Sequence, residues 1–370
     1  MAIRPLFAGY TFVYNKRERR NAMTLSTQLL NWYYENARDL PWRKDKDAYK
    51  IWVSEIMLQQ TRVEAVKDYY QRWIERFPTL EVLAEASEQE VLKYWQGLGY
   101  YTRARNLLAG VREVCATYGG EMPDDERTIQ RLPGVGEYTA GAIASIAYDR
   151  RTPAIDGNVL RIFSRLFCLD GDITKQATKR EVDRLVRQHM PYNCPGDFNQ
   201  ALMDLGATVC IPRNPRCQMC PLANLCEGYA REVQDTLPVR PVKKEPLLIH
   251  LAAGLVLRDG HYLVRRRPES GLLAGMWEFP TVELTEKGFA VERLKEGLQN
   301  EFGQEAAVGK REFHYIHTFS HRKWDISFYQ CQWLAGSEPL EGVRWLTSTE
   351  GNPLPWAGPH HKVALALGLA

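Results

Sequence analysis

The sequence lacks the features that mark a membrane or secreted protein. It has no apolar run of about eighteen residues, the length that a membrane-spanning helix needs, and its first residues lack the order of a secretory signal. It also has little net charge: the formal value of +3 gives weak support for binding to nucleic acid. We therefore expect a cytoplasmic protein of two or three domains, because 370 residues can bury more than one core.

The spacing of apolar residues divides the chain. From Leu25 to about Ala230 they recur at helical spacing, in segments such as LEVLAEASEQEVLKYWQGL and TKREVDRLVRQHM, which predicts an all-α region over 24–230. Residues 1–23 show no helical period and are an extension of unknown role. Three prolines and a basic pair in REVQDTLPVRPVKKEP indicate a linker over 231–246.

The chain after the linker has a different pattern. Two apolar runs flank Asp259-Gly260, a dipeptide favoured in tight hairpins, so this part opens with strands. A helix is expected near VERLKEGLQNEF, and strands in FHYIHTFSH and WDISFYQCQWL. We expect a mixed α/β or α+β domain over 247–370.

Cysteine is not scarce, since the chain has eight, and a reducing compartment favours thiols and metal ligands over disulfides. Cys210, Cys217, Cys220 and Cys226 follow the spacing C-x6-C-x2-C-x5-C. Four thiolates in so short a loop suit a tetrahedral metal or a four-iron cluster. Zinc and unligated thiols are the alternatives.

A glycine-rich turn, LPGVGEYTA, leads into the apolar helical stretch AGAIASIAY. Gly134 and Gly136 allow the backbone to turn sharply, so that the first amides of the next helix point at an incoming anion. A DNA phosphate is the natural ligand. An ordinary tight turn between helices is the alternative.

Two carboxylates have contrasting surroundings. Ile51, Glu55 and Leu58 fall at i, i+4 and i+7 of the helical stretch AYKIWVSEIMLQQT, so Glu55 projects from an apolar stripe. Desolvation there raises its pKa, which suits a general acid. Asp156 directly precedes a helix, where amide donors and the helix dipole favour the ionised form. Cleavage of a glycosidic bond needs such a pair, whereas a simple helix cap and an exposed glutamate are the alternatives.

These motifs, in this order, resemble the helix-hairpin-helix DNA glycosylase superfamily. Within it, SEIMLQQT, QGLGYYTRARNL, IDGNVLR and FNQALMDLGATVC resemble the adenine DNA glycosylase, or MutY, family over residues 24–370. The resemblance implies an all-α glycosylase domain with a six-helix barrel over about 50–148 and a cluster module formed by 24–49 and 149–230. It also implies a cleft between them, a [4Fe-4S] cluster instead of zinc, and a C-terminal Nudix-like α/β domain.

The resemblance also assigns the chemistry. Glu55 would protonate N7 of adenine, and Asp156 would stabilise the oxocarbenium ion or attack it transiently. Tyr138 and Asn158 would orient these groups and the attacking water. Related bifunctional glycosylases have a lysine nucleophile at the position of Tyr138, and a tyrosine cannot form a Schiff base. The enzyme is therefore predicted to be monofunctional and to leave an abasic site.

An adenine must leave the duplex before its glycosidic bond can be reached, so further residues must fill the gap and contact the partner base. By resemblance, the residues for this work are Gln60, Thr61, Leu98 and Tyr100. Those that would line the adenine pocket are Trp42, Arg43 and Gln200, and those that would hold a phosphate are Gly134, Val135 and Gly136. The expected partner is double-stranded DNA with adenine opposite 8-oxoguanine or guanine, bound by a monomer associated with the nucleoid.

The C-terminal domain carries Phe319-Ser320-His321, and F-S-H is the tripeptide with which this family reads 8-oxoguanine. The stretch VERLKEGLQNEFG lacks an R-E-x-x-E-E pattern, so we expect recognition here, not magnesium-dependent hydrolysis. Three other functions compete: a bifunctional pyrimidine glycosylase and lyase, a non-catalytic iron-sulfur DNA-binding protein, and a nucleotide pyrophosphatase. The lyase is opposed by Tyr138, and the non-catalytic protein is opposed by the pair Glu55 and Asp156. The pyrophosphatase is opposed by the degenerate Nudix helix.

Overall fold

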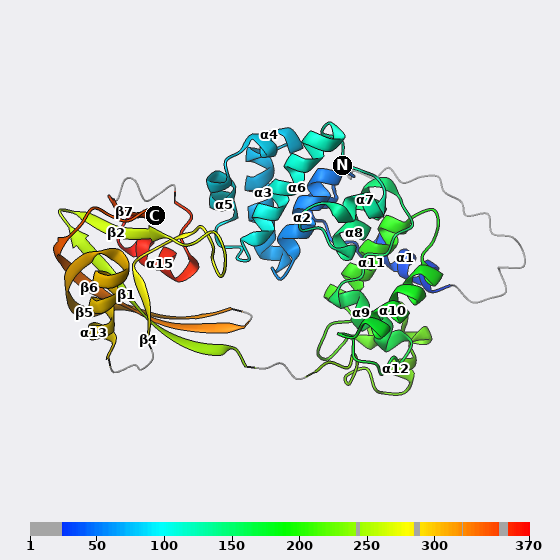
Figure 1. Cartoon of the computed structure of the whole chain (residues 1–370). Helices are drawn as coiled ribbons and strands as arrows, with labels where there is room; N and C mark the ends of the chain where they lie inside the picture. Colours follow the sequence, from blue (N-terminus) through cyan, green and yellow to red (C-terminus); the bar gives the residue numbers. More distant parts are fainter. Residues whose placement is uncertain (1–23, 242–244, 285–288, 320, 348–353) are drawn as a thin grey trace, which may run out of the picture. The chain divides into compact units, whose positions relative to one another are not determined.

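The computed structural model describes residues 24–241, 245–284, 289–319, 321–347 and 354–370 (Figure 1). The expected extension over 1–23, and Ser320, lie outside the described residues. Helices occupy the chain up to Ala230, and the first strand begins at Leu247, so the predicted fold class is confirmed: an all-α part is followed by an α/β part. Among the described residues, no helix has the length and apolar character that crossing a bilayer requires.

The chain forms two compact units. The first gathers the described residues up to Asp39, Asp124–Arg127 and Glu137–Pro241, and the second gathers Leu40–Pro123, Thr128–Gly136 and the described residues from Glu245 onward. The helices of the first unit are α1 (Leu25–Asn36), α8 (Glu137–Tyr148), α9 (Gly157–Leu166), α10 (Gln176–His189), α11 (Pro195–Thr208) and α12 (Glu227–Ala230), with the short 3-10 helices η3 (Cys217–Met219) and η4 (Ala223–Leu225). The helical part of the second unit contains η2 (Pro41–Arg43), α2 (Ala48–Leu58), α3 (Val63–Arg76), α4 (Leu80–Glu85), α5 (Glu88–Trp95) and α6 (Thr102–Tyr118), and α7 (Glu126–Arg131) belongs partly to each unit.

Side-chain caps decide where several helices begin. The sequence predicts helical spacing across LEVLAEASEQEVLKYWQGL, but the structure divides this stretch into α4 and α5. The division falls at Ala86 and Ser87 because Oγ of Ser87 accepts a hydrogen bond from N of Glu90 at 3.2 Å and starts a new helix. The C-terminal end of α6 is set by Gly119, which takes a φ of +64°, an angle that glycine adopts without strain.

A seven-stranded sheet forms the rest of the second unit (Figure 1). Its strands are β1 (Leu247–Arg258), β2 (His261–Arg266), β3 (Trp277–Glu278), β4 (Thr281–Leu284), β5 (Gln304–Thr318), β6 (Arg322–Gly336) and β7 (Val343–Leu346). The order is β3-β2-β1-β6-β5, with β4 paired to β1 and β7 to β2. β1 and β6 are parallel, and the other pairs are antiparallel. The predicted hairpin is confirmed, because Asp259 and Gly260 join β1 to β2 with φ angles of +47° and +79°.

Among the described residues, one helix packs on each face of this sheet. α13 (Ala290–Phe302) packs Leu294 and Leu298 against residues of β1 such as Val256. α15 (Gly358–Ala366) packs Val363 on the opposite face, where Leu255 of β1 is buried. Alternate residues of β1 thus enter two different cores, as expected for a strand buried on both faces.

Candidate active site

Asp156 immediately precedes α9, and its side chain caps the helix. Its Oδ1 accepts hydrogen bonds from N of Asn158 at 2.8 Å and from N of Val159 at 2.9 Å. Its Oδ2 accepts a third, of 2.6 Å, from Nδ2 of Asn158. The predicted cap is present, and all three donors are fixed by the first turn of the helix.

The pKa of Asp156 nevertheless departs from its ordinary value in the direction opposite to the one expected. Burial raises it, and this effect outweighs the three hydrogen bonds and the charge of Arg161, which lower it. The sequence indicated the donors but gave no measure of burial. The ionised carboxylate of Asp156 is therefore oriented by strong donors in a place that disfavours its charge.

Arg161 is a residue of this site that the sequence analysis missed. It is 5% exposed, and its Nη2 donates to Oδ1 of Asn158 and to the carbonyl of Gly206, both at 2.8 Å. Its Nε donates to the carbonyl of Cys210 at 2.8 Å. The guanidinium of Arg161 thus links two features: the side-chain amide of Asn158, which orients Asp156, and Cys210, where the cysteine loop starts. Its only signal in the sequence is an arginine among the apolar residues of NVLRIFSRL.

The segment that leads into Asp156 is held from two sides. Nδ2 of Asn199, a fully buried residue of α11, donates to the carbonyl of Thr152 at 2.9 Å, and its Oδ1 accepts from N of Ala154 at 3.1 Å. On the other side, a Cβ added to Gly141 of α8 would lie 2.0 Å from the carbonyl oxygen of Pro153, so only glycine permits this approach. Tyr138 stands one turn earlier on α8 and is half-buried.

Glu55 lies on α2 in the second unit and is 4% exposed. Ile51 is 2% exposed, but all residues from 51 to 57 are buried, so Glu55 lies on a helix that is buried on every side and not on one apolar stripe. The helix was expected to continue through Gln59, Gln60 and Thr61, but it ends at Leu58. Gln60 has a φ of +59°, which no helix accommodates, and its side chain is exposed.

Arg103 joins the two segments assigned to the partner base, and the sequence analysis missed it too. Its Nη1 donates to the carbonyls of Ile56 at 2.7 Å and Gln59 at 2.6 Å. Its Nη2 donates to the carbonyls of Leu98 at 3.1 Å and Gly99 at 3.0 Å. The turn that carries Gln60 and Thr61 is therefore fixed to the loop that carries Leu98 and Tyr100.

The other assigned residues differ in exposure. Trp42 is 5% exposed and packs edge to face on Tyr70 at 5.4 Å, and Tyr100 is 46% exposed. The first unit holds Tyr138, Asp156, Asn158 and Gln200, which is half-buried on α11. The second unit holds Glu55, Trp42, Arg43, Gln60, Thr61, Leu98 and Tyr100.

The glycine-rich turn between α7 and α8 closes with a hydrogen bond from N of Val135 to the carbonyl of Leu132 at 3.1 Å. Gly134 has a φ of +73°, and a Cβ there would lie 2.6 Å from Cβ of Asn106, so glycine is required. Gly136 is exposed, and an added Cβ would meet nothing within 4 Å. The turn thus leaves the first amides of α8 accessible to an anion.

The four cysteines of the predicted cluster line one cavity in the first unit. Arg165 is buried against it: Nη1 donates to the carbonyl of Ile211 at 2.8 Å and lies 3.4 Å from Sγ of Cys210. Burial and the neighbouring thiolates raise the pKa of Cys220 to about 12, so four bare thiolates are unfavourable here. Four sulfur donors around one apolar cavity fit a bound metal-sulfur group.

Comparisons with known proteins agree with this arrangement. A family model described as HhH-GPD superfamily base excision DNA repair protein matches residues 53–188, a NUDIX domain model matches 252–366, and the iron-sulfur binding domain of endonuclease III matches 210–226. The chain is 39% identical over 381 residues to adenine DNA glycosylase of Mus musculus, covering 88% of this chain and 74% of that protein. The chain belongs to the adenine DNA glycosylase family. The Homo sapiens member is 38% identical over 383 residues, covering 87% and 70%.

A solved structure of a thermostable thymine-DNA glycosylase is also similar to this glycosylase, with a TM-score of 0.52, 30% identity, and coverage of 56% of this chain and 95% of that one. Membership of the family makes the chain a base-excision DNA repair enzyme that binds DNA. Its cofactor is the predicted [4Fe-4S] cluster, and the iron-sulfur model matches the segment 210–226, which contains the four cysteines.

The end of the β5–β6 hairpin in this glycosylase, called the tip below, carries Phe319 and His321. N of Phe319 donates to the carbonyl of Arg322 at 2.7 Å and closes the tip. The Phe319 ring packs edge to face on His317 at 4.5 Å and on Trp324 at 5.0 Å. Phe319 is therefore directed at the core of the sheet domain, while His321 is exposed.

Proposed function

We propose that this glycosylase removes adenine paired with 8-oxoguanine or guanine and leaves an abasic site without cutting the strand. The curated relatives are named for adenine, which supports the substrate base. Tyr138, at the start of the helix that follows the glycine-rich turn, carries the monofunctional part of the proposal, because it offers no amine for a Schiff base. We further propose that it acts as a monomer in the cytoplasm, on nucleoid DNA.

The proposed reaction divides the work between the two carboxylates. Glu55 donates its proton to N7 of the flipped adenine, and the bond between N9 and C1′ breaks with its electron pair going to the base. The anionic Asp156 stabilises the positive charge on the sugar. A water oxygen then attacks C1′, and the proton that it gives up returns to the Glu55 carboxylate, which restores the starting protonation. Nδ2 of Asn158 fixes the oxygen of Asp156 that faces this charge, and Tyr138 orients the water.

Recognition is assigned to residues outside this pair. Trp42, Arg43 and Gln200 line the proposed adenine pocket. Gln60, Thr61, Leu98 and Tyr100 fill the gap and contact the partner base, and the tip at 319–321 reads 8-oxoguanine. Amides of the turn Gly134-Val135-Gly136 bind a phosphate. The [4Fe-4S] cluster, when bound, supplies folding energy to the loop that exposes Arg213 and Arg216 for contact with DNA.

One experiment tests the proposed function directly. The purified protein is incubated with a duplex that contains a single adenine opposite 8-oxoguanine, and strand breaks are counted before and after alkali. We expect breaks only after alkali, because an abasic site breaks under β-elimination that the enzyme does not perform. Breaks before alkali would assign a lyase activity, and no breaks after alkali would refute adenine removal.

A further inference from the structure

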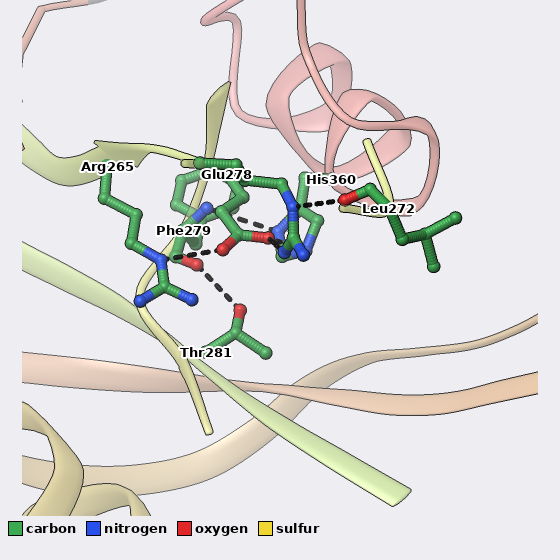
Figure 2. Close-up of polar contacts among 7 residues, drawn as sticks. Arg265, Leu272, Glu278, Phe279, Thr281 and His360 are labelled. Atoms are coloured by element: carbon green, nitrogen blue, oxygen red, sulfur yellow. Dashed lines mark hydrogen bonds and ion pairs between the residues drawn. The ribbon is translucent and has the colours of Figure 1, made fainter. Parts of the chain in front are cut away.

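The sheet domain contains a fully buried carboxylate, Glu278 of β3 (Figure 2). Its Oε1 accepts from Nε of Arg265 at 2.7 Å, and its Oε2 accepts from Nη1 of Arg267 at 2.6 Å. Nε2 of His360, from α15, lies 3.6 Å from the same Oε2. Two arginines on one buried carboxylate give charge-assisted hydrogen bonds that fix both guanidinium groups.

The two arginines contact different parts of the domain. The guanidinium of Arg265 lies 5.0 Å from the ring of Phe302, at the end of α13. That of Arg267 lies 5.5 Å from the ring of Trp324, on β6. Arg267 is also held by a hydrogen bond of 2.9 Å from its Nε to the carbonyl of Leu272. Arg265 and Arg267 thus share one anchor but support opposite sides of the sheet.

Trp324 connects Arg267 to the hairpin tip. Its side chain is 5% exposed, and its ring meets that of Phe319 at 71° with centroids 5.0 Å apart. The other side of Phe319 meets His317 on β5. The first residue of the tripeptide is therefore held between two rings, and one of these rings lies under a guanidinium that Glu278 fixes.

We propose that Arg267 is a positioning residue for partner-base recognition, acting through Trp324 and Phe319 on His321 at the end of the β5–β6 hairpin. This inference rests on the proposed function, because it presumes that the tip reads 8-oxoguanine. Phe319 serves as the internal anchor of the hairpin end, and the exposed His321 contacts the base. A loosened anchor should weaken discrimination between partner bases and leave the chemistry of adenine release intact.

Arg265 offers a matched control. Its replacement also removes a hydrogen bond to Glu278, but its guanidinium packs on Phe302 and not on Trp324. Arg267→Gln and Arg265→Gln are compared in the full-length protein by thermal melting and by dissociation constants for duplexes with adenine opposite 8-oxoguanine and opposite guanine. We expect Arg267→Gln to reduce the affinity ratio by about threefold to tenfold and Arg265→Gln to change it by less than about twofold. Arg267→Lys, which keeps a cation beside Glu278, serves if the glutamine variant fails to fold.

A double variant separates positioning from general destabilisation. If Arg267 acts through the tip, Arg267→Gln combined with His321→Ala should lose no more discrimination than His321→Ala alone. Equal ratios for the Arg267 and Arg265 variants, or additive losses in the double variant, would overturn the inference. A parent protein that does not prefer 8-oxoguanine over guanine would instead refute the proposed function, so the two failures are distinguishable.

Discussion

Nδ2 of Asn158 donates a hydrogen bond of 2.6 Å to Oδ2 of Asp156. The bond orients the carboxylate and lowers its pKa, against the effect of burial. Asn158→Ala should therefore slow adenine release by about tenfold to a hundredfold and leave duplex binding nearly unchanged. The acidic limb of the rate against pH should move to higher pH, because the remaining carboxylate is easier to protonate. Single-turnover rates across pH measure both effects, with the exposed Asn193→Ala as the control.

Asp156 should destabilise the fold at neutral pH. Its pKa is raised in the folded state, so the folded state holds the proton more tightly than the unfolded chain does. The free energy of unfolding then falls as pH rises from the ordinary aspartate range through the raised native pKa. Asp156→Asn should therefore melt at a higher temperature than the parent at neutral pH, and the difference should shrink as the pH falls towards the ordinary aspartate range.

The pKa of Asp172 is shifted in the opposite direction to that of Asp156, so Asp172 serves as the control for the melting experiment. It is half-buried, and its pKa is lowered by hydrogen bonds from N and Oγ1 of Thr174. Its stabilising effect is present at neutral pH and is lost as pH falls through the lowered pKa. Asp172→Asn should melt no higher than the parent. A destabilised Asp156→Asn at neutral pH would show that its hydrogen bonds outweigh burial.

Arg103 should be essential for both recognition segments of the second unit. A lysine keeps the charge but cannot donate to carbonyls of α2 and of the loop at 98–99 at once. We expect Arg103→Lys to lower the free energy of unfolding by about 2 kcal/mol and to weaken binding of the mispaired duplex by about tenfold. Arg112→Lys is the control, because Arg112 lies on the same helix and donates instead to the carbonyls of Ala84 and Ala86. Similar binding losses in both variants would assign Arg103 to stability alone.

Cys217→Ser should remove a ligand of the cluster. We expect loss of the brown colour and of iron, together with weaker binding to DNA, because Arg213 and Arg216 are then no longer held by a folded loop. Cys115→Ser, outside the cluster, should retain iron. Metal analysis that finds zinc and no iron in the parent would contradict the assigned cofactor.

Local patterns in the sequence were enough to predict the elements that depend on a few neighbouring residues. Asp259-Gly260 forms the hairpin because that dipeptide adopts positive φ angles easily, and Asp156 caps α9 because a short acceptor precedes free amides. The spacing of the cysteines predicted a shared metal or cluster site, and the structure places all four around one cavity. The catalytic roles assigned to these residues stay predictions until measured.

The features that could not be predicted from the sequence depend on contacts between residues far apart in the chain. Burial of Asp156 depends on how α9 packs, so its raised pKa could not be read from the cap alone. Arg103 and Arg161 each bond to carbonyls far away in the chain, and no local pattern distinguishes them from exposed arginines. The end of α2 at Leu58 depends on the left-handed Gln60, a conformation that glutamine rarely adopts.

The central claim is that Glu55 and Asp156 perform the cleavage of the glycosidic bond. Single-turnover release of adenine from a duplex with 8-oxoguanine is compared for the parent, Glu55→Gln and Asp156→Asn, together with the dissociation constant of each for that duplex. The account predicts that each variant loses adenine release while its affinity stays within about threefold of the parent, because both groups act in the transition state. Release at the parental rate by either variant would contradict it.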